Sequence, residues 1–224
     1  MLTLPGVFAP ISDSWQLADA VRREPLLAGS TALDLCTGSG VVAVAAAERG
    51  ASVTAVDVSR RALLATWWNA RRNGTRVRLR RGRLFAPVAG ERFDLISANP
   101  PYVPADGEAL PTHGPERAWA AGPDGRAVLD RICDEAPGHL WPGGVLLVVH
   151  SSLIDVDATV ERMVAAGLVG VRVTDRRVGP LGPLMREQQR AGRIDPDVTE
   201  EAVVVVRGVN PSRSSSSAPH RTRR

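Results

Sequence analysis

The sequence predicts an α/β protein with a seven-stranded, mostly parallel sheet and helices on both faces. Three observations lead to this fold class. Short apolar runs rich in β-branched residues alternate along the chain with stretches of helical periodicity. A glycine-rich turn follows the first apolar run, and an acidic residue ends the second. Parallel strands joined by right-handed helical crossovers produce this alternation.

The first half of the chain is expected to form four strands, with helices joining the first three. Ser59 can accept a backbone N–H as an N-cap, and Asn73-Gly74 favours the left-handed turn that ends a helix. The expected strands are Thr31–Leu35, Ser52–Val56, Arg76–Arg80 and Phe93–Ala98, and the expected helices run from Val41 to about Arg49 and from Ser59 to about Arg72.

The second half opens with a loop, punctuated by Pro and Gly, that extends to about Pro123. A polar stretch containing Pro180, Pro183 and Pro196 separates the last two expected strands. In order, the expected elements are a helix near Arg126–Leu140, a strand Val145–His150, a helix Asp155–Ala166, and strands Val171–Thr174 and Ala202–Arg207. We expect residues 1–209 to form one domain. The Ser/Arg-rich residues 210–224 cannot bury apolar surface, so they are expected to be a disordered tail.

The distribution of charge gives only a weak indication of nucleic-acid binding. All 28 basic residues of the 224 are Arg, and four of them lie in the last fifteen positions, which contain no acid. The remaining 24 Arg balance the 24 acids. One internal cluster, Arg71–Arg83, contains seven Arg and no acid. It is either a patch for an anionic partner or the solvated side of a strand, since Val77 and Leu79 alternate with its arginines.

Several protein classes are disfavoured. No apolar run approaches the roughly 18 residues of a membrane helix, and the amino terminus lacks a basic region before an apolar one. Two cysteines, Cys36 and Cys133, do not make a disulfide framework, and the four histidines share no ligand-like spacing. We therefore expect a cytoplasmic protein with no membrane segment and no metal site.

The first functional motif is Asp34-Leu-Cys-Thr-Gly38-Ser-Gly40, between the first strand and the first helix. Two glycines separated by one residue allow a tight turn and a close backbone approach to a ligand. Asp57 ends the second strand 19 residues after Gly38, where an acid can accept both hydroxyls of a ribose. Together these residues predict a nucleoside cofactor.

The position of Asp34 favours one type of cofactor. A carboxylate inside the glycine turn would repel a diphosphate, whereas S-adenosylmethionine carries an ammonium and a sulfonium that it would attract. A dinucleotide cofactor is the alternative, since Ala43 at the third-glycine position is tolerated there. Cys36 is interpreted as a packing residue that offers only its backbone.

The second motif, Asn99-Pro100-Pro101-Tyr102, ends the fourth strand. Two consecutive prolines restrict this corner, so the Asn99 side-chain oxygen and the Pro100 carbonyl can be held as two converging acceptors. Such a pair suits a planar –NH2 group, with Tyr102 against its flat face. An amide nitrogen is a poor nucleophile, and holding both of its hydrogens supplies the orientation that methylation requires.

Asp34–Gly40, Asp57 and Asn99–Tyr102 together resemble class I S-adenosylmethionine-dependent methyltransferases, which have a Rossmann-like fold. Two further stretches resemble the HemK-like release-factor glutamine methyltransferases, in particular their short branch. They are Phe8-Ala-Pro10-x-x-Asp13-Ser14 and the stretch from His113 to Arg131, which contains Trp119, Gly125 and Arg126. The resemblance implies protein glutamine N5-methylation, on a peptide-chain release factor or a similar protein.

The same resemblance implies roles for individual residues. Asn99 would bind the substrate amide, and Leu84 would lie at the adenine. The other residues implied to line the cofactor are Ser14, Asp34, Cys36, Gly38, Gly40 and Asp57. Two positions depart from the family pattern: Arg83 stands where an acid usually faces the adenine amino group, and Ala9 replaces a Glu.

Other interpretations stay open. An N-methyltransferase acting on an exocyclic amine of RNA or DNA is the main alternative, favoured by the Arg71–Arg83 cluster. A dinucleotide oxidoreductase and a non-catalytic binding module are also considered. Trp67 and Trp68 are interpreted as packing and rim residues, while Trp119 has no assigned role. The short branch uses a small zinc-binding activator subunit in eukaryotes and archaea, and the sequence does not show whether this chain has one.

Overall fold

The computed structural model describes residues 1–211, apart from 5, 8, 108–109 and 112–113. Seven strands form one sheet in the order β3-β2-β1-β4-β5-β7-β6. All neighbouring strands are parallel except for β7, which runs antiparallel to both β5 and β6. The sheet is the one expected, a seven-stranded and mostly parallel one. The strands are β1 (Thr31–Leu35), β2 (Ser52–Asp57), β3 (Val77–Arg81), β4 (Phe93–Ala98), β5 (Leu140–Ser151), β6 (Val169–Pro180) and β7 (Glu200–Val209).

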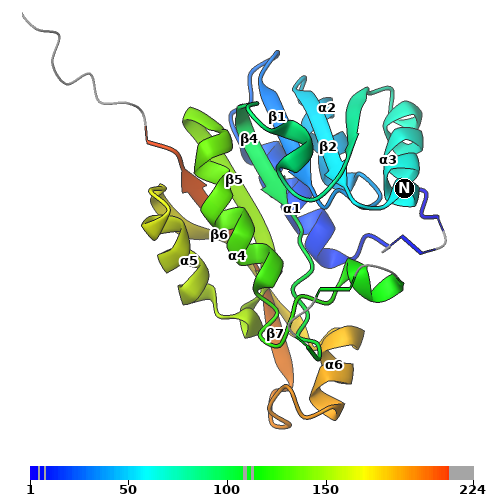
Figure 1. Ribbon diagram of the computed structural model, residues 1–224, viewed down its shortest axis with the longest axis vertical. Helices are drawn as coiled ribbons and strands as arrows, with labels where there is room; N and C mark the ends of the chain where they lie inside the picture. The colour runs from blue at the N-terminus through cyan, green and yellow to red at the C-terminus, as the bar shows by residue number, and fades with distance from the viewer. Residues whose placement is uncertain (5, 8, 108–109, 112–113, 212–224) are drawn as a thin grey trace, which may run out of the picture.

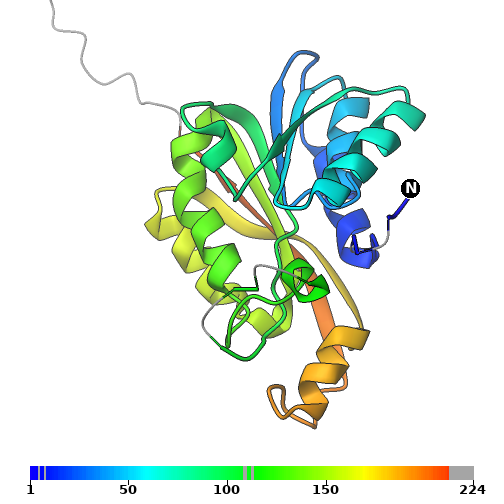
Figure 2. The same cartoon turned by 45° about the vertical axis from the view of Figure 1, so that its right-hand side comes forward.

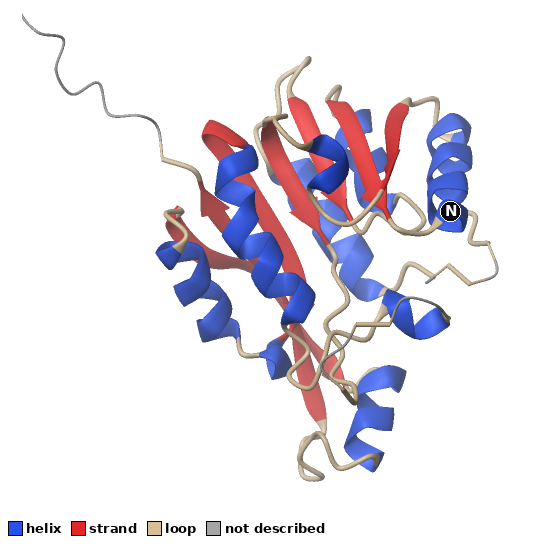
Figure 3. Cartoon of the chain, viewed as in Figure 1, coloured by secondary structure: helices blue, strands red, loops and turns tan. Residues whose placement is uncertain are grey.

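Helices cover both faces of this sheet (Figures 1 and 3). On one face, α1 and α2 bury an apolar layer with Leu17, Val42 and Leu95; on the other, α4 and α5 contribute Leu129, Ile132 and Met163. The helices are α1 (Ser12–Arg23), α2 (Val41–Glu48), α3 (Arg60–Arg72), α4 (Ala127–Glu135), α5 (Val156–Ala165) and α6 (Pro183–Arg190), with short 3₁₀ turns at Ala86–Val88, Pro115–Ala118, Ala136–His139 and Ser152–Ile154.

The expected elements of the first half lie within one residue of the observed ones. The Ser59 hydroxyl accepts the Ala62 N–H at 3.3 Å, as an N-cap does, and α3 ends at Arg72 before Asn73-Gly74. The central strand β1 pairs with β2 and β4 along its length, so the carboxyl ends of these three strands meet at one edge. That edge is where the predicted motifs lie.

Two helices and three strand lengths differ from the expectation. No helix was expected before Thr31, yet α1 occupies Ser12–Arg23 and packs on α2 and the sheet. The polar stretch expected between the last strands contains α6, which begins with Pro183 in its first turn. β5 and β6 are each twelve residues long, about twice and three times the expected lengths, and β7 has ten residues where six were expected. Figure 2 shows α6 beyond one end of the sheet, beside the long β6–β7 ribbon.

Candidate active site

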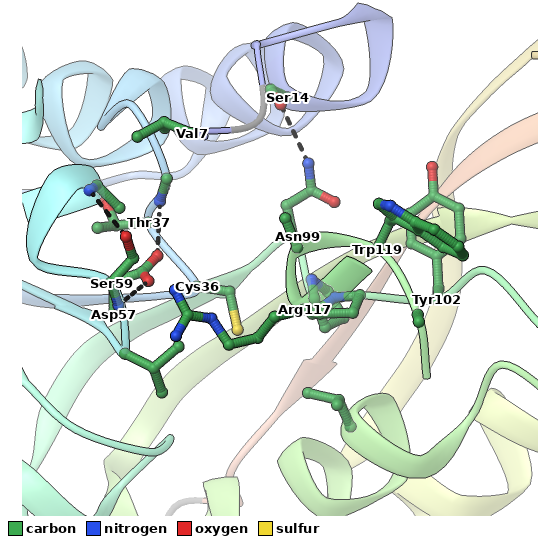
Figure 4. Close-up of a pocket in the computed structure, with 18 of the residues that line it drawn as sticks. Val7, Ser14, Cys36, Thr37, Asp57, Ser59, Asn99, Tyr102, Arg117 and Trp119 are labelled. Atoms are coloured by element: carbon green, nitrogen blue, oxygen red, sulfur yellow. Dashed lines mark hydrogen bonds between the residues drawn. The ribbon is translucent and has the colours of Figure 1, made fainter. Parts of the chain in front are cut away.

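A cavity of about 680 Å³ lies at the carboxyl ends of β1, β2 and β4. Its walls come from segments far apart in the sequence: the start of α1, the glycine turn before α2, the loop after β4 and the start of α6. A volume of this order is typical of a site for a nucleoside-sized ligand. Figure 4 shows how the labelled side chains converge on it from these segments.

The glycine turn has the backbone conformation that its sequence predicted. Gly38 and Gly40 have φ values of +55° and +84°, in the left-handed region that favours glycine. A Cβ added to Gly40 would lie 2.7 Å from Thr66 Cγ2, so α3 leaves no room for a side chain at that position. Thr66 also donates from its hydroxyl to the Gly38 carbonyl at 3.1 Å. The turn is therefore held against α3.

Two non-glycine residues at the cavity also have positive φ, namely Cys36 at +55° and Leu84 at +44°. This conformation is costly for a residue with a Cβ and persists only where the surroundings impose it. Burial raises the pKa of the Cys36 thiol well above its usual range, so this sulfur stays protonated. Cys36 is thus a cavity-lining residue with an unreactive, protonated thiol.

Asp57 is fixed by two backbone donors. Its Oδ2 accepts the Gly38 N–H at 3.0 Å and its Oδ1 accepts the Ser59 N–H at 2.8 Å. Burial raises the pKa of this carboxyl, while the two backbone donors and the positive charge of Arg117 oppose the rise. Figure 4 shows Arg117 extending from the loop after β4 toward Asp57. The carboxylate retains lone pairs that can accept ribose hydroxyls.

Asp34 lies in β1, beneath the glycine turn, and is 2% exposed. Its two oxygens accept from the hydroxyls of Thr37, at 2.6 Å, and Ser97, at 2.9 Å. Burial raises its pKa to about 6, although these hydrogen bonds act in the opposite direction. Among the described residues, the groups that act on the Asp34 carboxyl are hydrogen-bond donors and the acid Asp57, and none of them is a cation. A cation placed at the turn would stabilise its ionised form.

The wall expected to face the adenine contains Leu84, 8% exposed, and Arg83. Arg83 follows β3 and is exposed at the rim of the cavity. A guanidinium cannot accept the N–H of an adenine amino group, so contacts on this side reduce to apolar surface and backbone groups.

Asn99 and Tyr102 lie at the end of β4 and are both tied to the first turn of α1. The Asn99 amide nitrogen donates to the Ser14 hydroxyl at 3.1 Å, and the Tyr102 hydroxyl donates to Asp13 Oδ2 at 2.9 Å. Pro100, which lies between them in the sequence, lines the same cavity. The structure therefore brings together the residues of both motifs and the Asp13-Ser14 pair.

Several cavity residues had no role assigned from the sequence, among them Asp13, Arg117, Glu201 and Met185. Trp119, to which the sequence assigned no role, packs with Tyr102 and Met185 in a small apolar cluster beside the cavity. Glu201 accepts the Gly182 N–H at 2.7 Å and the Ser151 hydroxyl at 2.5 Å, which anchors the start of α6. No local pattern marks these positions, because the residues that they meet are distant in sequence.

The histidines that the structure describes have structural surroundings. His139 stacks on Phe85, with ring centroids 4.5 Å apart. His150 is fully buried in β5, and burial lowers its pKa to about 4. His113 and His220 lie outside the described residues, as do Phe8 and residues 212–224 of the expected tail. Within the described ranges, no group of His, Cys, Asp and Glu is arranged to hold a metal ion.

The Arg71–Arg83 cluster lies along the outer edge of the sheet. Val77 and Leu79 in the edge strand β3 are partly buried, while Arg78 and Arg80 are exposed, as expected for the solvated side of a strand. Charged side chains on an edge strand also oppose pairing with other chains. On the neighbouring helix, Trp67 and Trp68 are 41% and 45% exposed. They are surface residues, and Arg71 stacks on Trp67.

Comparison with known families gives a match to the Methyltransferase small domain over residues 1–112. A ribosomal protein uL3 glutamine methyltransferase of Bradyrhizobium diazoefficiens is 48% identical over 51% of this chain and 39% of its own length. A release factor glutamine methyltransferase of Geobacter sulfurreducens is 41% identical over 64% of this chain and 53% of its own. A Methanocaldococcus jannaschii protein that bears the name "Putative protein N5-glutamine methyltransferase" is 30% identical over 81% of this chain and 90% of its own length.

The chain therefore spans about two fifths of the first relative, about half of the second and nearly the whole of the third. Among solved structures, a T. Thermophilus 16S rRNA N2 methyltransferase in complex with AdoMet and guanosine aligns with a TM-score of 0.63, at 19% identity, over 92% of this chain and 46% of its own. This likeness shows a shared fold, the class I methyltransferase fold. No helix among the described residues is long and apolar enough to cross a membrane.

Proposed function

The chain belongs to the methyltransferase small domain family, and on that premise we propose that it methylates the amide nitrogen of a glutamine side chain in a protein, with S-adenosylmethionine as the methyl donor. The observation that carries the proposal is the position of Asn99. Its amide nitrogen is engaged by Ser14, which leaves its oxygen as an acceptor at the cavity. A substrate –NH2 group can donate to that oxygen.

The residues of the cavity suit S-adenosylmethionine. Gly38 leaves the backbone of the turn bare at the cavity wall, whereas Gly40 does not line the cavity and lets the turn pack against α3. Asp57 is held with free lone pairs for ribose hydroxyls. The buried charge of Asp34 favours a cationic ligand. Ser14, Cys36 and Leu84 complete the set proposed to line the cofactor. When bound, this cofactor supplies a methyl group on a positively charged sulfur.

The chain's own contribution to the chemistry is orientation. The nitrogen of a carboxamide has a delocalised lone pair, so it attacks only when it is turned toward the electrophile. We propose that Asn99 Oδ1 accepts one N–H of the substrate and the Pro100 carbonyl the other, with Tyr102 at the side of the group. Two oriented acceptors strengthen as positive charge develops on the nitrogen. No strong base is required, because the proton becomes acidic after methyl transfer and leaves to solvent.

We propose that the acceptor is a protein of the translation apparatus, either a peptide-chain release factor or a ribosomal protein. The relatives named for these two activities support this class of substrate. The substrate side of the cavity has apolar and aromatic walls from Trp119, Leu184 and Met185, which suit a peptide segment rather than a free charged metabolite. A cytoplasmic location follows from this proposal, because translation takes place there.

The test offers the enzyme radiolabelled S-adenosylmethionine together with a release factor, ribosomal protein uL3, ribosomal RNA and DNA in parallel reactions. Protease-sensitive label that maps to a glutamine supports the proposal. Nuclease-sensitive label would overturn it in favour of an exocyclic-amine methyltransferase, the function that the arginines of β3 favour. A release factor whose acceptor glutamine is changed to asparagine is the matched control and should take up no label.

A further inference from the structure

Asn99 and Tyr102 are linked through a chain of hydrogen bonds that passes outside their own loop. The chain runs from the Asn99 amide nitrogen to the Ser14 hydroxyl, from that hydroxyl to Asp13 Oδ1 at 3.2 Å, and from Asp13 Oδ2 to the Tyr102 hydroxyl. All four residues line the cavity. Asp13 and Ser14 belong to the first turn of α1, so two residues of the β4 corner are joined by a helix about 85 positions away.

The direction of every hydrogen bond in this chain is set by Asp13. An ionised carboxylate can only accept, so both hydroxyls next to it must donate to it. Ser14 then has no hydrogen left for Asn99 and can only accept from it. Asn99 must therefore turn its –NH2 toward Ser14 and its Oδ1 away. Among the described residues, no group donates to that oxygen.

We propose that Asp13 is a positioning residue that selects which end of the Asn99 amide faces the substrate. The proposal rests on the proposed function, because it assigns Asn99 Oδ1 as the acceptor of the substrate N–H. Without the carboxylate, the Ser14 hydroxyl could donate to Asn99 as readily as accept from it. The amide could then present –NH2 to the substrate –NH2, and two donors repel each other.

The surroundings of Asp13 are consistent with a fixed role. The side chain is 2% exposed and makes a further contact to the Ser14 backbone N–H at 2.5 Å. The Tyr102 hydroxyl is held by the same carboxylate, and burial together with this negative charge raises the pKa of Tyr102 well above its usual range. Tyr102 thus remains a neutral donor and keeps its ring in one orientation beside Asn99.

The test is Asp13→Asn, which keeps size and shape but can donate as well as accept. We expect kcat to fall about 10- to 100-fold, because misorientation of a reacting group costs this much, while the dissociation constant for S-adenosylmethionine stays within about threefold. Asp94→Asn is the matched control. Like Asp13, Asp94 accepts from a side-chain hydroxyl, that of Thr31, but it lies at the opposite end of β4. Equal loss of kcat in both variants would overturn the proposal.

A second pair of variants covers the case in which Asp13→Asn does not fold. Ser14→Thr keeps a hydroxyl between Asn99 and Asp13, whereas Ser14→Ala removes it. We expect Ser14→Thr to retain most of kcat and Ser14→Ala to lose it to the same extent as Asp13→Asn. If both Ser14 variants have the same kcat, the hydroxyl does not transmit the orientation and the proposal is wrong.

A spectroscopic readout separates this inference from the proposed function. Tyr102 is the only tyrosine of the chain, so the tyrosine Fermi doublet in its Raman spectrum reports one hydrogen bond. The intensity ratio of the two bands depends on whether the phenol donates or accepts. We expect the wild type to have the ratio of a phenol that donates to a carboxylate, and we expect Asp13→Asn to shift this ratio. An unshifted doublet overturns the role of Asp13. Absence of glutamine methylation by the wild type, with a shifted doublet, overturns only the proposed function.

Discussion

The amide nitrogen of Asn99 lies 3.1 Å from the hydroxyl of Ser14, although the two residues are 85 positions apart. The contact joins the corner after β4 to the start of α1, and it leaves the other end of the Asn99 amide at the cavity. An asparagine held in this way is available as an acceptor at the cavity, which is the role that we propose for Asn99.

Asn99→Ala removes this acceptor. We expect kcat for methyl transfer to fall by about 10²- to 10³-fold, as for other oriented hydrogen-bonding groups at a reacting centre. Binding of S-adenosylmethionine, measured by calorimetry, should change little because Asp57 and the glycine turn are untouched. Asn73→Ala is the control, since Asn73 ends α3 at an exposed position and its side chain donates to the Asn69 carbonyl, away from the cavity. Unchanged turnover in Asn99→Ala would refute the role assigned to Asn99.

Gly40→Ala places a methyl group 2.7 Å from Thr66 Cγ2 on a backbone with φ of +84°. Thr66 would have to move, and its hydroxyl holds the Gly38 carbonyl. We expect a loss of about 2 to 4 kcal/mol in the free energy of unfolding, together with weaker cofactor binding.

Gly74→Ala provides the matched comparison for Gly40→Ala. Gly74 also has a positive φ, of +65°, but an added Cβ there meets no atom within 4 Å. Only the backbone cost of about 1 kcal/mol is expected, with normal cofactor binding. Chemical denaturation of both variants gives the two values. Equal destabilisation would show that the contact with Thr66 is relieved at no cost.

The elements that surround the two motifs could be predicted because each carries its own local signal. β1 and β2 are buried apolar strands, and α3 has a serine N-cap and an Asn-Gly end. α6 was missed because its prolines were interpreted as loop residues, although Pro183 in a first turn is a helix-start signal. α1 lacks a side-chain N-cap bond, which removes one of the usual signs of a helix start.

The site could be predicted only in part for a different reason. Gly38, Asp57 and Asn99 lie within motifs whose spacing is visible in the sequence. The Asp13–Tyr102 and Ser14–Asn99 contacts depend on how α1 packs beside the end of β4, and no local pattern encodes a contact across 85 or more residues. The positive φ of Cys36 and Leu84 was also not predictable, because neither is a residue type that favours it.

Arg83→Asp should strengthen cofactor binding. An aspartate at this rim position can accept an N–H from the adenine amino group, which an arginine cannot. One added hydrogen bond of about 1 kcal/mol corresponds to a roughly fivefold lower dissociation constant. Arg80→Asp makes the same charge change on the adjacent strand without lining the cavity, so it controls for the change in overall field. A gain of equal size in both variants would mean that charge alone, and not the adenine contact, is responsible.

Asp34→Asn should change the pH dependence of stability. Burial raises the pKa of Asp34 to about 6 in the folded protein, whereas the pKa is about 4 in the unfolded chain. The folded protein therefore binds this proton more tightly, and this stabilises the fold fully at a pH below 4. This contribution is lost as the pH rises through 6. Asn cannot ionise, so the stability of the variant relative to the wild type should increase between pH 4 and pH 7, by on the order of 2 kcal/mol. Urea denaturation across this range measures the difference, and a difference that does not vary with pH would contradict the burial of a titrating carboxyl.

The same carboxyl should make cofactor binding pH-dependent. A cationic ligand at the glycine turn favours ionised Asp34, which lowers the pKa of this carboxyl from about 6 on binding. Binding then releases a proton near pH 6, and the affinity of the wild type for S-adenosylmethionine rises as the pH increases from 5 to 7. Asp34→Asn has no such proton to release, so its affinity should be lower at pH 7 and nearly constant over this window. Calorimetry in buffers of different ionisation enthalpy counts the released protons directly. If the variant releases as many protons as the wild type, then another group senses the positive charge and Asp34 serves only to hold Thr37 and Ser97.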